Sequence, residues 1–230
     1  MKLLVVSPHL DDGVIGCGDA LAGTESAAVV TVFAGIPLTG MPAGYWDKRS
    51  GFSSGEEATL KRREEDSAAL AVLGAEPIWL DFVDSQYGPR PSAAAITAAV
   101  GTALTAVGPD AVMVPMGLGH ADHRLVRRAT LRLRPLLPTV TWILYAEPIY
   151  RLSALRVEHV LSTMSRAGIG LSSESTPSDL VSSSQKRDAV SCYRSQLRTL
   201  LSVERSRITD ILAPERQWLV TGATSRPVPQ

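Results

Sequence analysis

The chain has 230 residues, 45% of them hydrophobic, which is enough for one domain with a sizeable core. Its 23 basic and 23 acidic residues give a formal net charge of zero, so nucleic acid and anionic membranes are not expected partners. No run resembles a signal peptide or membrane span, and Cys17 and Cys192 suggest no disulfide, which together favour a cytoplasmic protein.

The predicted elements alternate between strands and helices over the first two thirds of the chain. Apolar runs predict strands at 3–6, 28–33, 78–82, 111–114 and 140–145. Helices are expected over 14–22, 56–73 and 92–107, and from about 121 to 134. This alternation predicts an α/β fold with a mainly parallel sheet and helices on both faces. The long loop 35–55 carries Tyr45, Trp46 and Phe52 and is a candidate substrate wall.

The pattern loosens after Pro148. We expect an added strand at 157–163, with His159 on it, a Ser- and Gly-rich loop at 168–184, and an amphipathic helix at 185–201. The tail 221–230 is expected to fray. We therefore predict a single domain over 1–230, with an α/β core of about 1–150 and a C-terminal elaboration of about 151–220.

Three of the four histidines lie in two short clusters, and each cluster comes directly after a predicted buried strand. The first is Ser7-Pro8-His9-Leu10-Asp11-Asp12, and the second is Gly119-His120-Ala121-Asp122-His123. The carboxyl ends of parallel strands share one crevice, so the two clusters are expected to converge. Two imidazoles and a carboxylate in a crevice predict a metal site with open positions.

Each cluster also has a simpler interpretation. Asp11 or Asp12 can cap the helix that begins there, and one histidine of the second cluster can do the same while the other lies on the surface. Two clusters that both come after strands make the metal interpretation stronger together than apart. With zinc, a bound water molecule becomes a nucleophile near neutral pH, a nearby carboxylate can act as the general base, and a free histidine can serve the leaving group.

The strand-Pro-His-x-Asp-Asp motif, with a later His-x-Asp-His, resembles the PIG-L/LmbE-like N-acetylglucosaminyl deacetylases. Further stretches resemble the family's Arg-x-Glu-Glu…Leu-Gly helix, the strand and acidic loop that come after it, and the Lys…Tyr-x-Ser-Gln helix: 62–74, 79–84 and 186–196. The resemblance implies a Rossmann-like three-layer fold and a Zn²⁺-dependent hydrolase. Its substrate would be an N-acetylated amino-sugar conjugate, cleaved to acetate and a free amine.

The resemblance also assigns roles to individual residues. It implies that His9, Asp12 and His123 bind zinc and that Asp11 is the general base. It implies that His120 stabilises the tetrahedral intermediate or protonates the leaving amine.

By the same resemblance, Asp122 orients a neighbouring histidine, while Arg63 and Asp84 contact the sugar. A homo-oligomer is compatible with these assignments. The chain departs from the family at Leu10, Gly13 and Ala121, and at Leu118, where some members carry a tyrosine.

Three other functions are compatible with parts of the pattern. An amidase cleaving a different acyl group or a thiol conjugate would use the same metal site. A nucleotide-binding module is suggested by Gly13-x-x-Gly16-x-Gly18, although the spacing differs from the dinucleotide fingerprint and two aspartates would repel a pyrophosphate. Two histidines and one carboxylate also occur in non-haem iron oxygenases, which are usually built on a different fold.

Overall fold

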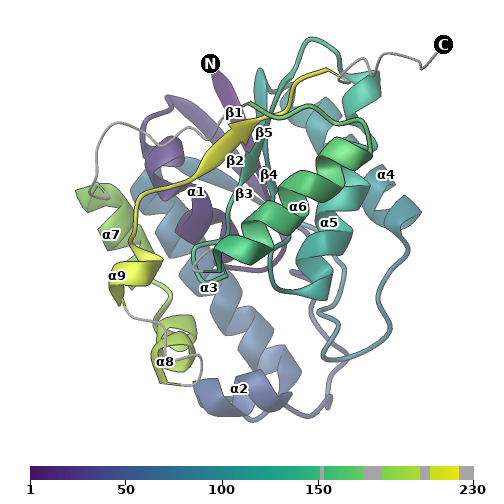
Figure 1. The fold of residues 1–230 in the computed structure, drawn as a ribbon. Helices are drawn as coiled ribbons and strands as arrows, with labels where there is room; N and C mark the ends of the chain where they lie inside the picture. The colour runs from purple at the N-terminus through teal and green to yellow at the C-terminus, as the bar shows by residue number, and fades with distance from the viewer. Residues whose placement is uncertain (151–152, 173–182, 203–207, 223–230) are drawn as a thin grey trace, which may run out of the picture.

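A six-stranded sheet forms the centre of the computed structural model, which describes residues 1–150, 153–172, 183–202 and 208–222 (Figure 1). Its strand order is β3-β2-β1-β4-β5-β6, with the last strand antiparallel to its neighbour and the others parallel. The strands are β1 (Lys2–Ser7), β2 (Ser26–Thr31), β3 (Ala75–Trp79), β4 (Ala111–Pro115), β5 (Thr141–Tyr145) and β6 (Gln217–Leu219). The order reverses between β1 and β4, and ligands bind at such a point in doubly wound folds.

Helices cover both faces of this sheet, as the alternation predicted (Figure 1). Successive side chains of β1 point to opposite faces, so Leu4 and Val6 enter one core and Leu3 and Val5 enter the other. The first core is closed by α4 (Ala93–Val107), α5 (Ala121–Leu131) and α6 (Ala154–Arg166). The second is closed by α1 (Asp12–Ala22), α3 (Gly55–Leu73), α7 (Ser184–Ser191), α8 (Arg194–Ser202) and α9 (Ile208–Ile211).

The strand expected at 157–163 is wrong, because these residues lie within α6. Val157, Val160 and Met164 are buried at helical spacing and pack into the first core. His159 is therefore an exposed helical residue, and its alternation with valines was misleading. The expected loop 168–184 and tail 221–230 lie largely outside the described residues.

Three other expectations need correction. The helix expected over 185–201 is two helices, α7 and α8, which meet at Cys192 and Tyr193. The loop 35–55 contains a short helix, α2 (Tyr45–Ser50). The helix expected to reach about 134 ends at Leu131, and a 3₁₀ turn, Arg134–Leu136, comes after it. The edge strand β6 was not expected, because three residues carry too little periodicity to be recognised.

Candidate metal centre

Each histidine cluster lies where a central strand turns into a helix. His9 comes after β1, and Asp12 is the first residue of α1. His120 is the N-cap of α5, and His123 lies in its first turn. Since β1 and β4 are hydrogen-bonded neighbours, the two clusters meet at the carboxyl edge of the sheet, as the sequence predicted.

Three ligand atoms converge there. Asp12 Oδ2 lies 3.1 Å from His9 Nδ1 and 3.1 Å from His123 Nε2, and the two nitrogens lie 3.2 Å apart. Tetrahedral ligands at the usual zinc distances are separated by about 3.3 Å. Two imidazoles and one carboxylate at this spacing fit a divalent transition metal with open coordination positions. The structure thus brings together the three residues that the resemblance named as ligands.

A carboxylate lies beside the other nitrogen of each ligand histidine, and the contact at His123 is a hydrogen bond. Glu147 Oε1 lies 3.0 Å from His123 Nδ1, while Asp122 Oδ2 lies 3.5 Å from His9 Nε2. Asp122 is fully buried and accepts hydrogen bonds from Ser85 Oγ at 2.6 Å and Arg90 Nε at 2.5 Å. Such partners fix the orientation of a ligand ring and raise its basicity. Asp122 therefore faces His9, consistent with the orienting role that the resemblance implied.

Asp11 and Asp12 are adjacent, but the surrounding protein groups shift their pKa values in opposite directions. Burial, and then the charge of Asp12, raises the pKa of Asp11 to about 7. Burial opposes ionisation of Asp12 as well, but the His123 and His9 imidazoles outweigh it and hold that pKa well below its usual range. Asp11 makes no side-chain capping hydrogen bond, which removes the simple capping interpretation for this residue. Its environment is that of a general base.

His120 is both a helix cap and a cavity residue. Its Nδ1 accepts a hydrogen bond from the backbone N–H of Asp122 at 3.4 Å, so the capping interpretation is correct for this residue. Its ring nevertheless faces the metal centre, with centroids 5.3 Å from His9 and 5.5 Å from His123. Burial, and then the positive charge of His9, lowers the pKa of His120.

A cavity of about 310 Å³ opens over these groups. Trp46, from the predicted aromatic wall, lines it, whereas Tyr45 is 71% exposed. Asp84 lines it too and lies 4.0 Å from His9 Nε2. The lining comprises His9, Leu10, Asp11, Asp12, Phe33, Trp46, Thr59, Arg62, Asp84, Gln86, Tyr87, His120, His123, Ile149, Tyr150, Gln196 and Leu200.

Arg62, not Arg63, reaches this cavity. Arg63 instead stacks 5.0 Å above the Trp79 ring and donates from Nε to the Ala34 carbonyl at 2.8 Å. Arg62 is buried and pairs with Asp47 at 2.6 Å. Consecutive helical residues point in directions about 100° apart, so only one of the two arginines can face the cavity. Because α3 has many charged residues, the sequence pattern did not indicate which one.

Two motifs 130 residues apart contact each other. Glu65 of α3 accepts hydrogen bonds from the Ser195 backbone N–H at 3.0 Å and from Ser195 Oγ at 2.6 Å. Asp66 accepts one from Tyr193 Oη at 2.7 Å. These bonds hold α8 over α3, and Gln196 then reaches Trp46 Nε1 at 2.7 Å. The two stretches that resembled family helices thus build one wall of the cavity.

The sequence interpretation missed several site residues. Glu147, Tyr150 and Arg90 come from the connections after β5 and β3. One signal was available for Glu147. It is acidic, and like His9 and His120 it comes shortly after a predicted strand. No comparable signal in the sequence indicated which side of α3 faces the cavity, and therefore that Arg62 lines it.

The glycines that suggested a nucleotide site have packing roles. A methyl group on Gly16 would lie 2.7 Å from the Tyr145 ring, and one on Gly18 would lie 2.7 Å from Lys186 Cγ. A methyl group on Gly13 would lie 3.0 Å from Val29 Cγ1, and the Gly13 N–H donates to Ser7 Oγ at 2.8 Å. These close contacts explain the glycines without a bound pyrophosphate.

The strand order and the His/Asp centre define an α/β protein of the doubly wound class with a candidate metal site in the crevice at its switch point. Residues 4–133, more than half of the chain, match the family model described as "PIG-L: GlcNAc-PI de-N-acetylase". The chain belongs to this family, as the sequence motifs predicted. It is also 30% identical over 128 residues to the diacetylchitobiose deacetylase of Thermococcus kodakarensis. That match covers 54% of this chain and 45% of the relative, so the chain spans about half of its length.

Solved structures share the fold over nearly the whole chain. A deacetylase triple mutant of the teicoplanin biosynthetic pathway is 25% identical with a TM-score of 0.80, over 98% of this chain and 100% of that one. The zinc-inhibited form of teicoplanin deacetylase Orf2 is 23% identical with a TM-score of 0.81, over the same shares. The A40926 pseudoaglycone deacetylase Dbv21 is 24% identical with a TM-score of 0.75, over 98% and 99%. The predicted three-layer α/β fold is confirmed.

Proposed function

We propose that this protein is a zinc-dependent hydrolase that removes the acetyl group from an N-acetylated amino-sugar conjugate. The observation that carries the proposal is the triangle of His9, Asp12 and His123 ligand atoms, 3.1 to 3.2 Å apart, with Asp11 beside it. Family membership and the deacetylase relatives support the same reaction. When bound, the metal would polarise the amide carbonyl and lower the pKa of water.

The chain's own residues supply the proton transfers. Asp11, with its raised pKa, takes the proton from the attacking water. His120 lies beside the centre and donates a proton to the leaving nitrogen, which departs as the free amine while the acyl group leaves as acetate. Asp122, 3.5 Å from His9 Nε2, orients that ring, and Asp84 and Arg62, which line the cavity, contact the sugar hydroxyls.

No helix among the described residues is long and apolar enough to cross a membrane. Cys17 and Cys192 are free thiols in the structure, and the cytoplasmic location stays a prediction. The single-domain organisation and a homo-oligomer stay predictions.

The test uses the zinc-loaded protein with N-acetylglucosamine and N,N′-diacetylchitobiose, measuring acetate release and the loss of acetyl by mass spectrometry. Asp11→Asn is expected to lower turnover by about 10² to 10⁴ while the bound zinc, measured by elemental analysis, stays the same. The matched control is Asp81→Asn, whose side chain is 97% exposed and which should keep full activity. Normal turnover by Asp11→Asn would refute the general base, and no acetate from either sugar would refute the deacetylase proposal.

A further inference from the structure

The strand order divides the cavity into two flanks. β2 and β3 lie on one side of the β1–β4 crevice and β5 lies on the other. The connection after β3 contributes the polar Asp84 and Gln86 together with Tyr87, and Phe33 comes from the connection after β2. The connection after β5 contributes Ile149 and Tyr150, which are apolar apart from one hydroxyl. A substrate that crosses the metal centre therefore meets a carboxylate and an amide on the β3 side, whereas Ile149 and Tyr150 offer mainly apolar surface on the β5 side.

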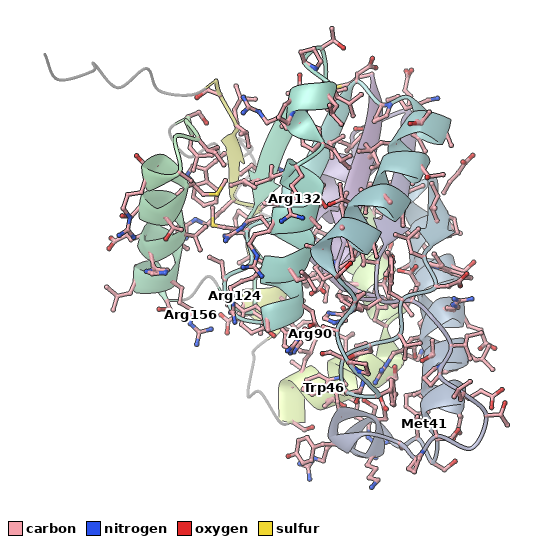
Figure 2. All side chains as sticks on the ribbon, turned by 90° about the vertical axis from the view of Figure 1, so that its right-hand side faces the viewer. Met41, Trp46, Arg90, Arg124, Arg132 and Arg156 are labelled. Carbon is pink, nitrogen blue, oxygen red and sulfur yellow. The ribbon has the colours of Figure 1, made fainter. Side chains whose placement is uncertain are left out.

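Tyr150 is held firmly in the apolar flank. Its backbone N–H donates to the Glu147 carbonyl at 3.0 Å, and its ring stands edge-on to His123 at 5.7 Å between centroids. Gly119 lies directly under the ring, so even a methyl group at that position would collide with it. The guanidinium carbon of Arg156 lies over the Tyr150 ring, 6.0 Å from its centroid. Figure 2 shows Arg156 close to Arg124 of α5. A ring confined by these groups acts as a fixed wall beside a ligand histidine.

The chemistry of an N-acyl amino sugar has the same two-sided character. A trans amide places its acyl chain and its nitrogen substituent on opposite sides of the C–N bond. The sugar carries hydroxyls that need hydrogen-bonding partners, whereas the acyl chain is apolar. Resting on the proposed function, we propose that the β5 flank is the acyl subsite and that Tyr150 sets the largest acyl group the enzyme accepts.

The first experiment compares N-acetyl-, N-propanoyl- and N-butanoylglucosamine as substrates of the zinc-loaded enzyme. One methylene against a fixed apolar wall changes kcat/KM by about 10- to 200-fold. Wild type should prefer acetyl over butanoyl by about tenfold or more. Tyr150→Ala should reduce that preference by about tenfold or more, mainly through better use of the longer chains. Tyr150→Phe should keep it, because the ring and not the hydroxyl forms the wall.

Trp46→Ala is the matched control, since Trp46 lies in α2 and approaches the cavity from another element. It should affect all three substrates by the same factor and leave the preference unchanged. Tyr150→Leu serves if the alanine variant does not fold, and should give a partial loss of preference. An unchanged preference in the folded Tyr150 variants, or an equal change in Trp46→Ala, would overturn the proposal.

A binding measurement separates this proposal from the proposed reaction. Acetate, propanoate and butanoate resemble the acyl product, and their affinities for the zinc-loaded protein can be measured by calorimetry without turnover. Wild type should bind acetate more tightly than butanoate, and in Tyr150→Ala the affinities for the three carboxylates should be similar. An inactive wild type that still shows this pattern would refute the deacetylase and support the acyl subsite. A series that does not respond to Tyr150→Ala would refute the subsite even in an active enzyme.

Discussion

Glu147 Oε1 lies 3.0 Å from His123 Nδ1, so a residue just after β5 fixes the ring of a ligand on α5. The same carboxylate accepts the backbone N–H of Gly117 at 2.7 Å and of Leu118 at 3.4 Å. It is only 2% exposed. The bend before α5 and the direction of His123 Nε2 toward Asp12 thus depend on one buried acid.

Replacing that acid tests its influence on the metal. Glu147→Gln keeps an acceptor but removes the charge that makes the imidazole more basic. Metal affinity should fall by about 10-fold, and by up to about 100-fold in Glu147→Ala. Zinc affinity is measured by competition with a chromogenic chelator, and the thermal midpoint gained on adding zinc should shrink in parallel.

Glu64→Gln is the control, since Glu64 is 67% exposed and pairs with Lys61 on the surface of α3. It should bind zinc as wild type does. An unchanged zinc affinity in both Glu147 variants would mean that the hydrogen bond to His123 does not support the metal centre.

Most of the metal centre could be predicted because its residues depend on strand ends. Strands β1 and β4 are short apolar runs, and neighbouring parallel strands bring the residues after their carboxyl ends to one edge of the sheet. Glu147 also comes after the carboxyl end of a strand, β5, but a single carboxylate after a strand is too common to indicate a site by itself.

Other features depended on long-range packing that local pattern does not contain. The break between α7 and α8 is held by Tyr193 Oη on Asp66 and by Ser195 on Glu65, far away on α3. Val157 and Val160 fit both a strand and a helix, and only the core under α6 decides between them.

The glycine at position 16 tests how closely α1 packs on the sheet. Alanine favours a helix over glycine by about 1 kcal/mol. Its methyl group would nevertheless lie 2.7 Å from the ring of Tyr145, which is fully buried and donates from Oη to the Val6 carbonyl at 3.0 Å. Gly16→Ala should therefore lower the free energy of unfolding by about 1–3 kcal/mol, measured by urea denaturation. Gly88→Ala, with no atom within 4 Å of the added methyl, should change it by less than about 0.5 kcal/mol.

Lys186 is a fully buried cation whose loss should strongly destabilise the fold. Its Nζ lies 2.8 Å from Glu215 Oε1 and 3.6 Å from Asp19 Oδ2. Lys186→Met leaves the buried Glu215 without its cationic partner, so the free energy of unfolding should fall by about 3–5 kcal/mol. Lys61→Met removes an exposed pair and should cost less than about 1 kcal/mol. Equal losses in the two variants would contradict a structural role for the buried pair.

The change of stability with pH in Lys186→Met depends on Glu215. Burial raises the pKa of Glu215, and the charge of Lys186 opposes the rise, so removing the lysine should raise this pKa further. An acid with a raised pKa in the folded state binds protons more readily there than in the unfolded chain, so stability falls as pH rises. Lys186→Met should therefore recover part of its lost stability when denaturation is repeated at pH 5 instead of pH 7. A larger deficit at pH 5 would contradict this account.

The two cysteines should differ in reactivity toward a thiol reagent. Burial, and then the charge of Glu215, raises the pKa of Cys17 well above its usual range, while burial raises the pKa of the partly exposed Cys192. Because the thiolate is the reactive form, a raised pKa slows the reaction at a given pH. In the native protein at pH 8 only Cys192 should react, slowly, and its rate should increase as pH rises. Cys192→Ser should show no reactive thiol until denaturant exposes Cys17, and rapid native labelling of that variant would contradict the packing of α1 against the sheet.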